Sequence, residues 1–129
     1  MMRKIYSMPA LLLAVAATGC VSAPTRDDVA EFKFMGAGKV PQTKLAEFSD
    51  CVIDGFDKAH TTPSAFRARQ VRRAAMTRVE SMMENSIVMS ADIHDDGRVE
   101  LYESSIAALL NLSGEKETFA ACVAKNTPQ

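Results

Sequence analysis

Between residues 43 and 59, apolar side chains recur at intervals of three and four positions. The recurring apolar residues are Leu45, Phe48, Val52 and Phe56, and acidic residues (Glu47, Asp50, Asp54 and Asp57) fill positions between them. This period places the apolar residues on one face of a helix and the acids on the other. The segment is therefore predicted to be an amphipathic α-helix lying on a hydrophobic core.

Residues 87–93 and 98–102 show a different pattern, because both are rich in the β-branched residues that favour strands. They flank Asp96 and Gly97, a pair typical of the tight turn in a β-hairpin. The sequence therefore predicts a hairpin over residues 92–103. A hairpin needs a further strand to be stable. Residues 65–83 fit either a helix or strands, and the alternation over residues 77–81 favours strands.

A second, shorter helix is predicted over residues 115–125, with Phe119, Cys122 and Val123 facing inward. The predicted fold class is α+β: an N-terminal helix, an antiparallel β-meander and a C-terminal helix, with both helices on one face of the sheet. Residues 104–112 are predicted to be a loop or a short helical turn. This single small domain spans residues 43–129.

Residues 20–42 are predicted to be a tether, because they contain prolines, glycines and scattered charge without a sustained period. Within this tether, residues 29–35 could pair as a short edge strand. Fully extended, the tether would reach on the order of 70 Å.

The first 20 residues form a three-part pattern that is typical of an export leader. Arg3 and Lys4 make a basic start, and residues 5–17 are mostly apolar. This apolar stretch is shorter than the roughly 20 residues that a membrane-spanning helix needs. Small residues then lead to Cys20.

The small residues before Cys20 resemble the lipobox-type signal peptide of bacterial lipoproteins, although Ala17 stands where that family usually has leucine. The resemblance implies that residues 1–19 are removed and that Cys20 is acylated, with palmitate as a typical chain. The protein would then be held by membrane lipid and face the periplasm. Val21 and Ser22, in place of aspartate, resemble outer-membrane sorting. An ordinary secretory signal, cut near the same place, is the alternative.

If Cys20 carries lipid, Cys51 and Cys122 are the two cysteines that remain. An even number of cysteines in an oxidising compartment predicts one disulfide. Both lie in the same Phe-x-x-Cys-Val context, and the bridge would link the two predicted helices. The alternative is a catalytic thiol at Cys51 with His60 as its base, although His60 also suits the end of a helix.

The charge balance argues against a nucleic-acid partner. The leader carries two basic residues and no acid, so the chain from Cys20 onward has 13 basic and 16 acidic side chains, a net charge of −3. A general nucleic-acid binder needs an excess of positive charge over its footprint.

Residues 92–103 resemble the twelve-residue calcium loop of an EF-hand. Asp92, Asp96 and Glu103 occupy positions one, five and twelve, and Gly97 occupies position six. The resemblance implies that these three acids are calcium ligands. It departs at position three, where His94 replaces an oxygen ligand, and the flanking segments favour strands. A plain hairpin turn with solvated acids is the alternative.

Arginines cluster between residues 67 and 78, whereas acids dominate residues 84–103. Cross-strand pairing would explain both runs. In the functional alternative, four of these arginines bind phosphate or carboxylate groups of an envelope component. These four are Arg67, Arg69, Arg72 and Arg73.

The sequence contains no serine-nucleophile motif, glycine-rich phosphate loop or CxxC pair. We therefore expect a non-enzymatic, lipid-anchored lipoprotein without a cofactor, which binds an envelope protein or glycan or supports envelope integrity. The alternatives are an inhibitory lipoprotein that acts against a lytic enzyme or phage, and a calcium-binding module.

Overall fold

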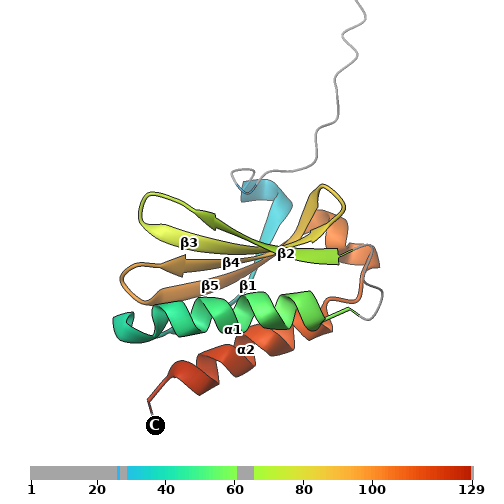
Figure 1. Ribbon diagram of the computed structural model, residues 1–129. Coiled ribbons are helices and arrows are strands. Elements are labelled where there is room, and N and C mark those ends of the chain that lie inside the picture. The colour runs from blue at the N-terminus through green and yellow to red at the C-terminus, as the bar shows by residue number, and fades with distance from the viewer. Residues whose placement is uncertain (1–25, 27–28, 61–65, 129) are drawn as a thin grey trace, which may run out of the picture.

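The computed structural model describes residue 26, residues 29–60 and residues 66–128. These residues form a five-stranded antiparallel sheet with two α-helices on one face (Figure 1). The strands are β1 (Phe32–Lys39), β2 (Phe66–Arg72), β3 (Met76–Met83), β4 (Ser86–His94) and β5 (Arg98–Ser104). The helices are α1 (Leu45–Lys58) and α2 (Ser113–Asn126), and the short 3-10 helices are η1 (Val29–Glu31), η2 (Gln42–Lys44) and η3 (Ser105–Leu109).

The strand order in the sheet is β1-β5-β4-β3-β2, so the first strand pairs with the last. The α+β class is confirmed, but the prediction that a helix begins the domain is wrong, because β1 precedes α1. The edge strand expected over residues 29–35 is confirmed in part, since β1 spans residues 32–39 and pairs with β5 at the edge of the sheet, so these residues belong to the domain and not to a tether. Pairing with β5 gives the backbone of this glycine-containing segment the partners that its local pattern did not reveal.

The undecided segment, residues 65–83, contains two strands. β2 pairs with β3, and β3 pairs in turn with β4, both in antiparallel register. The predicted hairpin is confirmed as β4 and β5. Gly97 in its turn has a φ of 98°, and a Cβ atom there would come within 2.3 Å of the Val40 carbonyl oxygen. Glycine is therefore required at this position.

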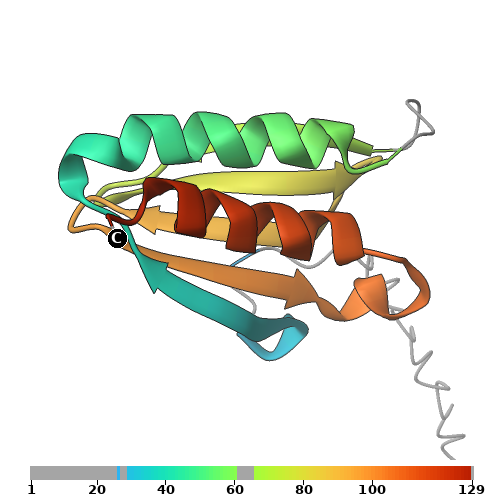
Figure 2. The same ribbon diagram turned by 90° about the horizontal axis from the view of Figure 1, so that it is seen from below.

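The hydrophobic core lies between the sheet and the two helices (Figure 2). Phe48 of α1 and Phe119 of α2 meet edge to face, with ring centroids 5.9 Å apart. The sheet contributes buried side chains from its three central strands, among them Val79, Met89, Ala91, Ile93, Val99 and Leu101. The prediction that both helices cover one face is thus confirmed. No helix among the described residues is long and apolar enough to cross a membrane.

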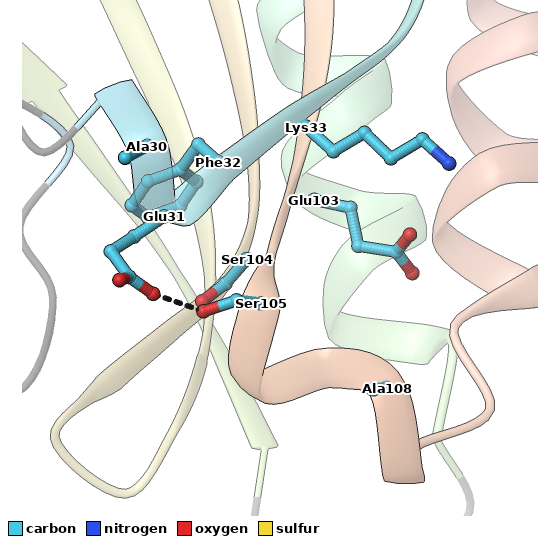
Figure 3. Close-up of a pocket in the computed structure, with 8 residues that line it drawn as sticks. All are labelled: Ala30, Glu31, Phe32, Lys33, Glu103, Ser104, Ser105 and Ala108. Atoms are coloured by element: carbon cyan, nitrogen blue, oxygen red, sulfur yellow. Dashed lines mark hydrogen bonds between the residues drawn. The ribbon is translucent and has the colours of Figure 1, made fainter.

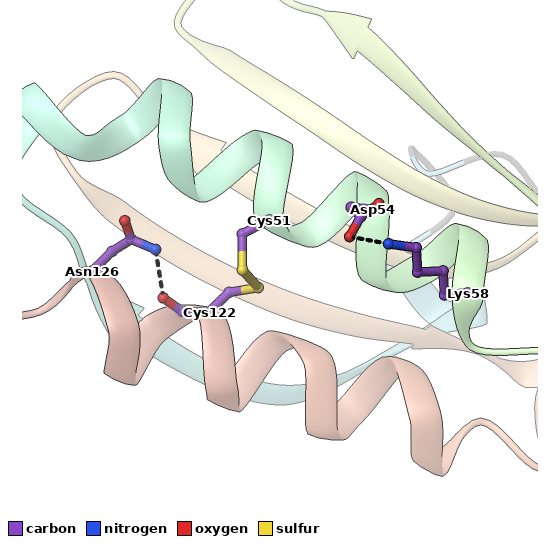
Figure 4. Close-up of a disulfide and its surroundings, with 5 residues drawn as sticks. All are labelled: Cys51, Asp54, Lys58, Cys122 and Asn126. Atoms are coloured by element: carbon purple, nitrogen blue, oxygen red, sulfur yellow. Dashed lines mark hydrogen bonds and ion pairs between the residues drawn. A yellow bond between two sulfur atoms is a disulfide. The ribbon is translucent and has the colours of Figure 1, made fainter.

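A disulfide between Cys51 and Cys122 joins α1 to α2, as predicted (Figure 4). The two Cα atoms lie 5.9 Å apart, and 71 residues separate the cysteines in the chain. Cys122 is buried in the core, and its carbonyl oxygen accepts a hydrogen bond of 2.8 Å from the Asn126 side chain. The bridge therefore fastens the last helix to the first.

Candidate functional site

The sheet face that points away from the helices carries a compact group of charged and polar side chains. Alternation along a strand sends Met89, Ala91 and Ile93 of β4 into the core and sends Ser90 and Asp92 to this other face. We call this group the charged face. It consists of Arg26, Arg69, Arg78, Glu80, Ser90, Asp92, His94, Glu100 and Tyr102.

Asp92 is the centre of the charged face. Its carboxylate accepts hydrogen bonds from Arg78 Nε at 2.9 Å, from Arg26 Nη2 at 3.1 Å and from Ser90 Oγ at 3.2 Å. Asp92 and Arg78 are buried, at 5% and 6% exposure. A buried carboxylate is tolerated when it is paired and hydrogen-bonded in this way.

Arg26 connects the N-terminal segment to this centre. In addition to its ion pair with Asp92, its guanidinium lies over the Tyr102 ring at 3.7 Å and near the Phe32 ring at 5.1 Å. Arginine stacks well on aromatic rings because its planar cation faces their negative π-surface. Phe32 also packs with Met82 and Ile87 in a small apolar cluster beside these polar groups. Arg26 therefore has both an electrostatic and a packing attachment to the sheet.

Glu100 forms a second group on the same face. Its carboxylate accepts a hydrogen bond of 2.5 Å from the Tyr102 hydroxyl and lies 2.7 Å from His94 Nε2. The hydrogen bond from Tyr102, and then the one from His94, hold the pKa of Glu100 below its usual value. The same bond to Glu100 raises the pKa of Tyr102. This arrangement keeps Glu100 as an acceptor and Tyr102 as a donor.

The arginines predicted to bind anions are divided by the structure. Arg69 lies on the charged face and pairs with Glu80 at 3.1 Å, whereas Arg72 pairs with Asp95 at 2.6 Å. Arg67 lies two residues before Arg69 on β2 and therefore shares its face, whereas Arg72 points to the other face and Arg73 follows the strand. Within the described part of the chain, Arg67 and Arg73 have no ion-pair partner. Cross-strand pairing accounts for the others.

The three acids of the calcium-loop resemblance do not converge. Asp92 binds the two arginines of the charged face, and Asp96 pairs with Arg98 at 2.8 Å in the turn. Glu103 lies opposite Met89 on the helix side and pairs with Lys116 at 3.3 Å. Among the described residues, no group of three or more metal-ligating side chains could hold an ion. The structure therefore gives the calcium hypothesis no site, because strand alternation separates its ligands.

His60, the alternative catalytic base, lies away from Cys51, whose thiol is in the disulfide. It makes a short contact with the fully buried Glu115 carboxylate and stacks on Phe66, with ring centroids 3.6 Å apart. The other Glu115 oxygen, Oε2, has no hydrogen-bond partner among the described residues. The pair joins the end of α1 to the first turn of α2 and accounts for His60 without catalysis.

The η1 and η3 helices meet at one corner of the molecule (Figure 3). The Ser105 hydroxyl donates a hydrogen bond to Glu31, and Phe32 pairs with Ser104. A hollow of about 240 Å³ between them is lined in part by Lys33, Glu103 and Ala108. Glu31 and Ser105 also line this hollow, so the hydrogen bond between them lies at its wall.

No protein-family model matches the chain, and no curated protein or solved structure is significantly similar to it.

The predicted lipidation residue, Cys20, and the leader lie outside the described residues. Arg26 and Tyr102 were missed by the sequence reasoning, although the hairpin register, once known, locates Tyr102. In the observed register, residues 95–97 form the turn and Asp92 lies opposite Glu100, whereas a two-residue turn at Asp96 and Gly97 would have placed Asp92 opposite Leu101. Alternation then places Ser90, Tyr102 and His94 on the same face. The contribution of Arg26 had no such local signal.

Proposed function

We propose that the protein is a non-enzymatic lipoprotein, anchored through acylated Cys20 and facing the periplasm from the outer membrane. The observation that carries this proposal is the cysteine arrangement. Because Cys51 and Cys122 are joined to each other, Cys20 is the one cysteine left for another use, and it directly follows a leader-like segment. The resemblance of the residues before Cys20 to a lipobox indicates that this other use is acylation.

The contacts of the charged face support a binding or structural role rather than catalysis. Its acids Glu80, Asp92 and Glu100 each have a basic or hydroxyl partner within the molecule. Such a compensated network orders the sheet face and fastens Arg26 to it. The domain would thus stand close to its anchor, ready to bind an envelope component.

The test is to follow a palmitate analogue into the protein in growing cells and to weigh the native protein by mass spectrometry. We expect an N-terminus at residue 20 that carries acyl chains, and Cys20→Ser should abolish the label. The matched controls are Cys51→Ser and Cys122→Ser, which should keep the label because neither removes the acceptor. An unlabelled native protein, or a label that persists in Cys20→Ser, would refute the proposal.

Arg67 and Arg73 are the arginines that this proposal leaves for an anionic envelope partner. Exchange of both for glutamate should reduce recovery of that partner in crosslinked pull-downs from native envelopes. The double variant Lys39→Glu with Arg98→Glu, at two exposed positions beside the β4–β5 turn, is the control that matches the change in net charge. Equal recovery of the partner with all variants would show that these two arginines do not take part in binding.

A further inference from the structure

The large apolar side chains with the greatest exposure in the described residues lie at one end of the sheet, at the corner where β5 ends and η3 begins. They are Phe34, Ile106 and Leu109, at 54%, 37% and 97% exposure. Phe34 lies opposite Tyr102, two residues before the end of β5, and η3 follows directly. Single exposed apolar residues are common on surfaces, but a group of them indicates an interaction site.

The backbone around η3 is held in place, so Leu109 is presented outward by a fixed structure. Ser104 Oγ accepts a hydrogen bond from the Ile106 amide at 3.3 Å, and the Leu110 amide donates to Ala107 at 2.9 Å. Ala107 is buried in the core at 1% exposure, and the Ser105 hydroxyl bonds to Glu31. Ala107 of the 3-10 helix is therefore buried in the core, while the residues on either side of it are exposed to solvent.

The attachment of Arg26 brings the anchor near this corner. Arg26 lies over the Tyr102 ring, and Tyr102 meets Phe34 with ring centroids 5.8 Å apart. Arg26 is the sixth residue after Cys20 in the sequence, and a chain of this length can span at most about 20 Å. The domain therefore lies much closer to Cys20 than it would if the whole of residues 20–42 were an extended tether.

We infer that Phe34, Ile106 and Leu109 rest in the interfacial layer of the same bilayer that holds Cys20. This inference depends on the proposed function. Apolar side chains of this kind enter the boundary between headgroups and acyl chains. Of the two acids beside η3, Glu31 is bonded to Ser105 and Glu103 is paired with Lys116. Neither carboxylate is therefore an uncompensated charge next to the apolar side chains.

The chain has no tryptophan, so the fluorescence of a single introduced tryptophan reports the environment of that one position. The experiment uses the full-length lipoprotein with Leu109→Trp, purified from membranes and reconstituted into phosphatidylcholine–phosphatidylglycerol vesicles with brominated acyl chains. Gln42→Trp is the matched control. Gln42 is exposed and lies beyond the far end of β1, about 25 Å from the corner. Mass spectrometry of each preparation records acylation of Cys20.

We expect Trp emission in the Leu109→Trp protein to shift to the blue and to fall by roughly half, because interfacial side chains lie about 5–10 Å into the headgroup–acyl boundary. Emission in the Gln42→Trp protein should be unchanged. An acylated Leu109→Trp protein that is not quenched would overturn the inference and leave the lipid anchor intact. Emission that is blue-shifted in native envelopes, but neither shifted nor quenched in the brominated vesicles, would assign the corner to a protein partner and also overturn the inference. Missing acylation would instead refute the proposed function.

Discussion

Arg26 and Asp92 lie 66 residues apart in the chain and form an ion pair of 3.1 Å, with side chains only 10% and 7% exposed. Asp92 belongs to the second-last strand, whereas Arg26 precedes the first. The pair therefore closes the N-terminal segment onto the middle of the sheet. It also limits the distance between the domain and Cys20, on which the proposed membrane orientation depends.

Arg26→Ala should lower the free energy of unfolding by about 2 kcal/mol, because it removes one of the charged donors of a buried carboxylate. Urea denaturation of the purified protein measures this change. Arg98→Ala is the matched control, since its ion pair with Asp96 is exposed and should contribute less than about 1 kcal/mol. Equal losses in the two variants would contradict the central role of Asp92.

Tyr102→Phe should raise the pKa of Glu100 towards its ordinary value of 4.5, because the hydrogen bond from Tyr102 is the largest cause of the lowered pKa. A carboxyl group with a lowered folded-state pKa stabilises the protein above its unfolded-state pKa, and this stabilisation is lost as the pH falls through the folded-state value. The variant should therefore lose about 1 kcal/mol at neutral pH and less in acid. Carboxyl-carbon NMR titration follows the pKa directly, and His94→Ala, which removes a weaker contribution, should give a smaller shift.

His60→Ala should destabilise the fold by about 3 kcal/mol, since it leaves the buried Glu115 carboxyl group without its partner and removes the stacking on Phe66. Thermal and urea unfolding measure the loss. The double variant His60→Ala with Glu115→Gln carries no charge at this site and should recover part of it. If the double variant is no more stable than His60→Ala alone, the loss comes from packing and not from the orphaned acid.

Removal of the disulfide in Cys51→Ala with Cys122→Ala should cost about 4 kcal/mol, the value expected for closure of a loop of roughly 70 residues in the chain-entropy model. Reduction of the wild-type protein should lower its stability by a similar amount. A double variant as stable as the oxidised wild type would show that packing between Phe48 and Phe119 holds the helices without the bridge.

Gly97→Ala should destabilise the protein by about 1–3 kcal/mol, because alanine is strained at positive φ and its Cβ would collide with the Val40 carbonyl oxygen. The matched control is Gly36→Ala in β1, where a Cβ would meet nothing within 4 Å. That control should be neutral or slightly stabilising. Calorimetry on the two variants tests whether the turn depends on this contact.

Several features of the fold followed from local patterns. The three- and four-residue period of Leu45, Phe48 and Val52 predicted α1, and Asp96 with Gly97 predicted the turn between β4 and β5. These signals succeed because a helix face or a tight turn is encoded within a few residues. The cysteine count predicted the disulfide for a different reason, namely the redox chemistry of the oxidising compartment that the leader-like segment led us to expect.

The features that local patterns did not predict all depend on contacts between distant segments. β1 contains Gly36 and Gly38 and has little strand propensity, so it is ordered by its ladder with β5, more than 60 residues away. The predicted anion cluster was likewise divided, because Arg72 points to the opposite face of β2 from Arg67 and Arg69 and pairs with Asp95, a residue far along the chain. Asp92 changed from a candidate calcium ligand to an ion-pair centre once Arg26 and Arg78 were placed beside it.

The amino-acid sequence by itself determined the α+β class, the central hairpin, the two helices and the pair of cysteines that joins them. Only the tertiary structure decided that a strand begins the domain, that Arg26 is fastened to the sheet and that three exposed apolar side chains lie at one end of the sheet. The physical reason is that periodicity and turn chemistry act over a few residues, whereas the neighbours of an edge strand or a charged side chain are chosen by the packing of the whole domain.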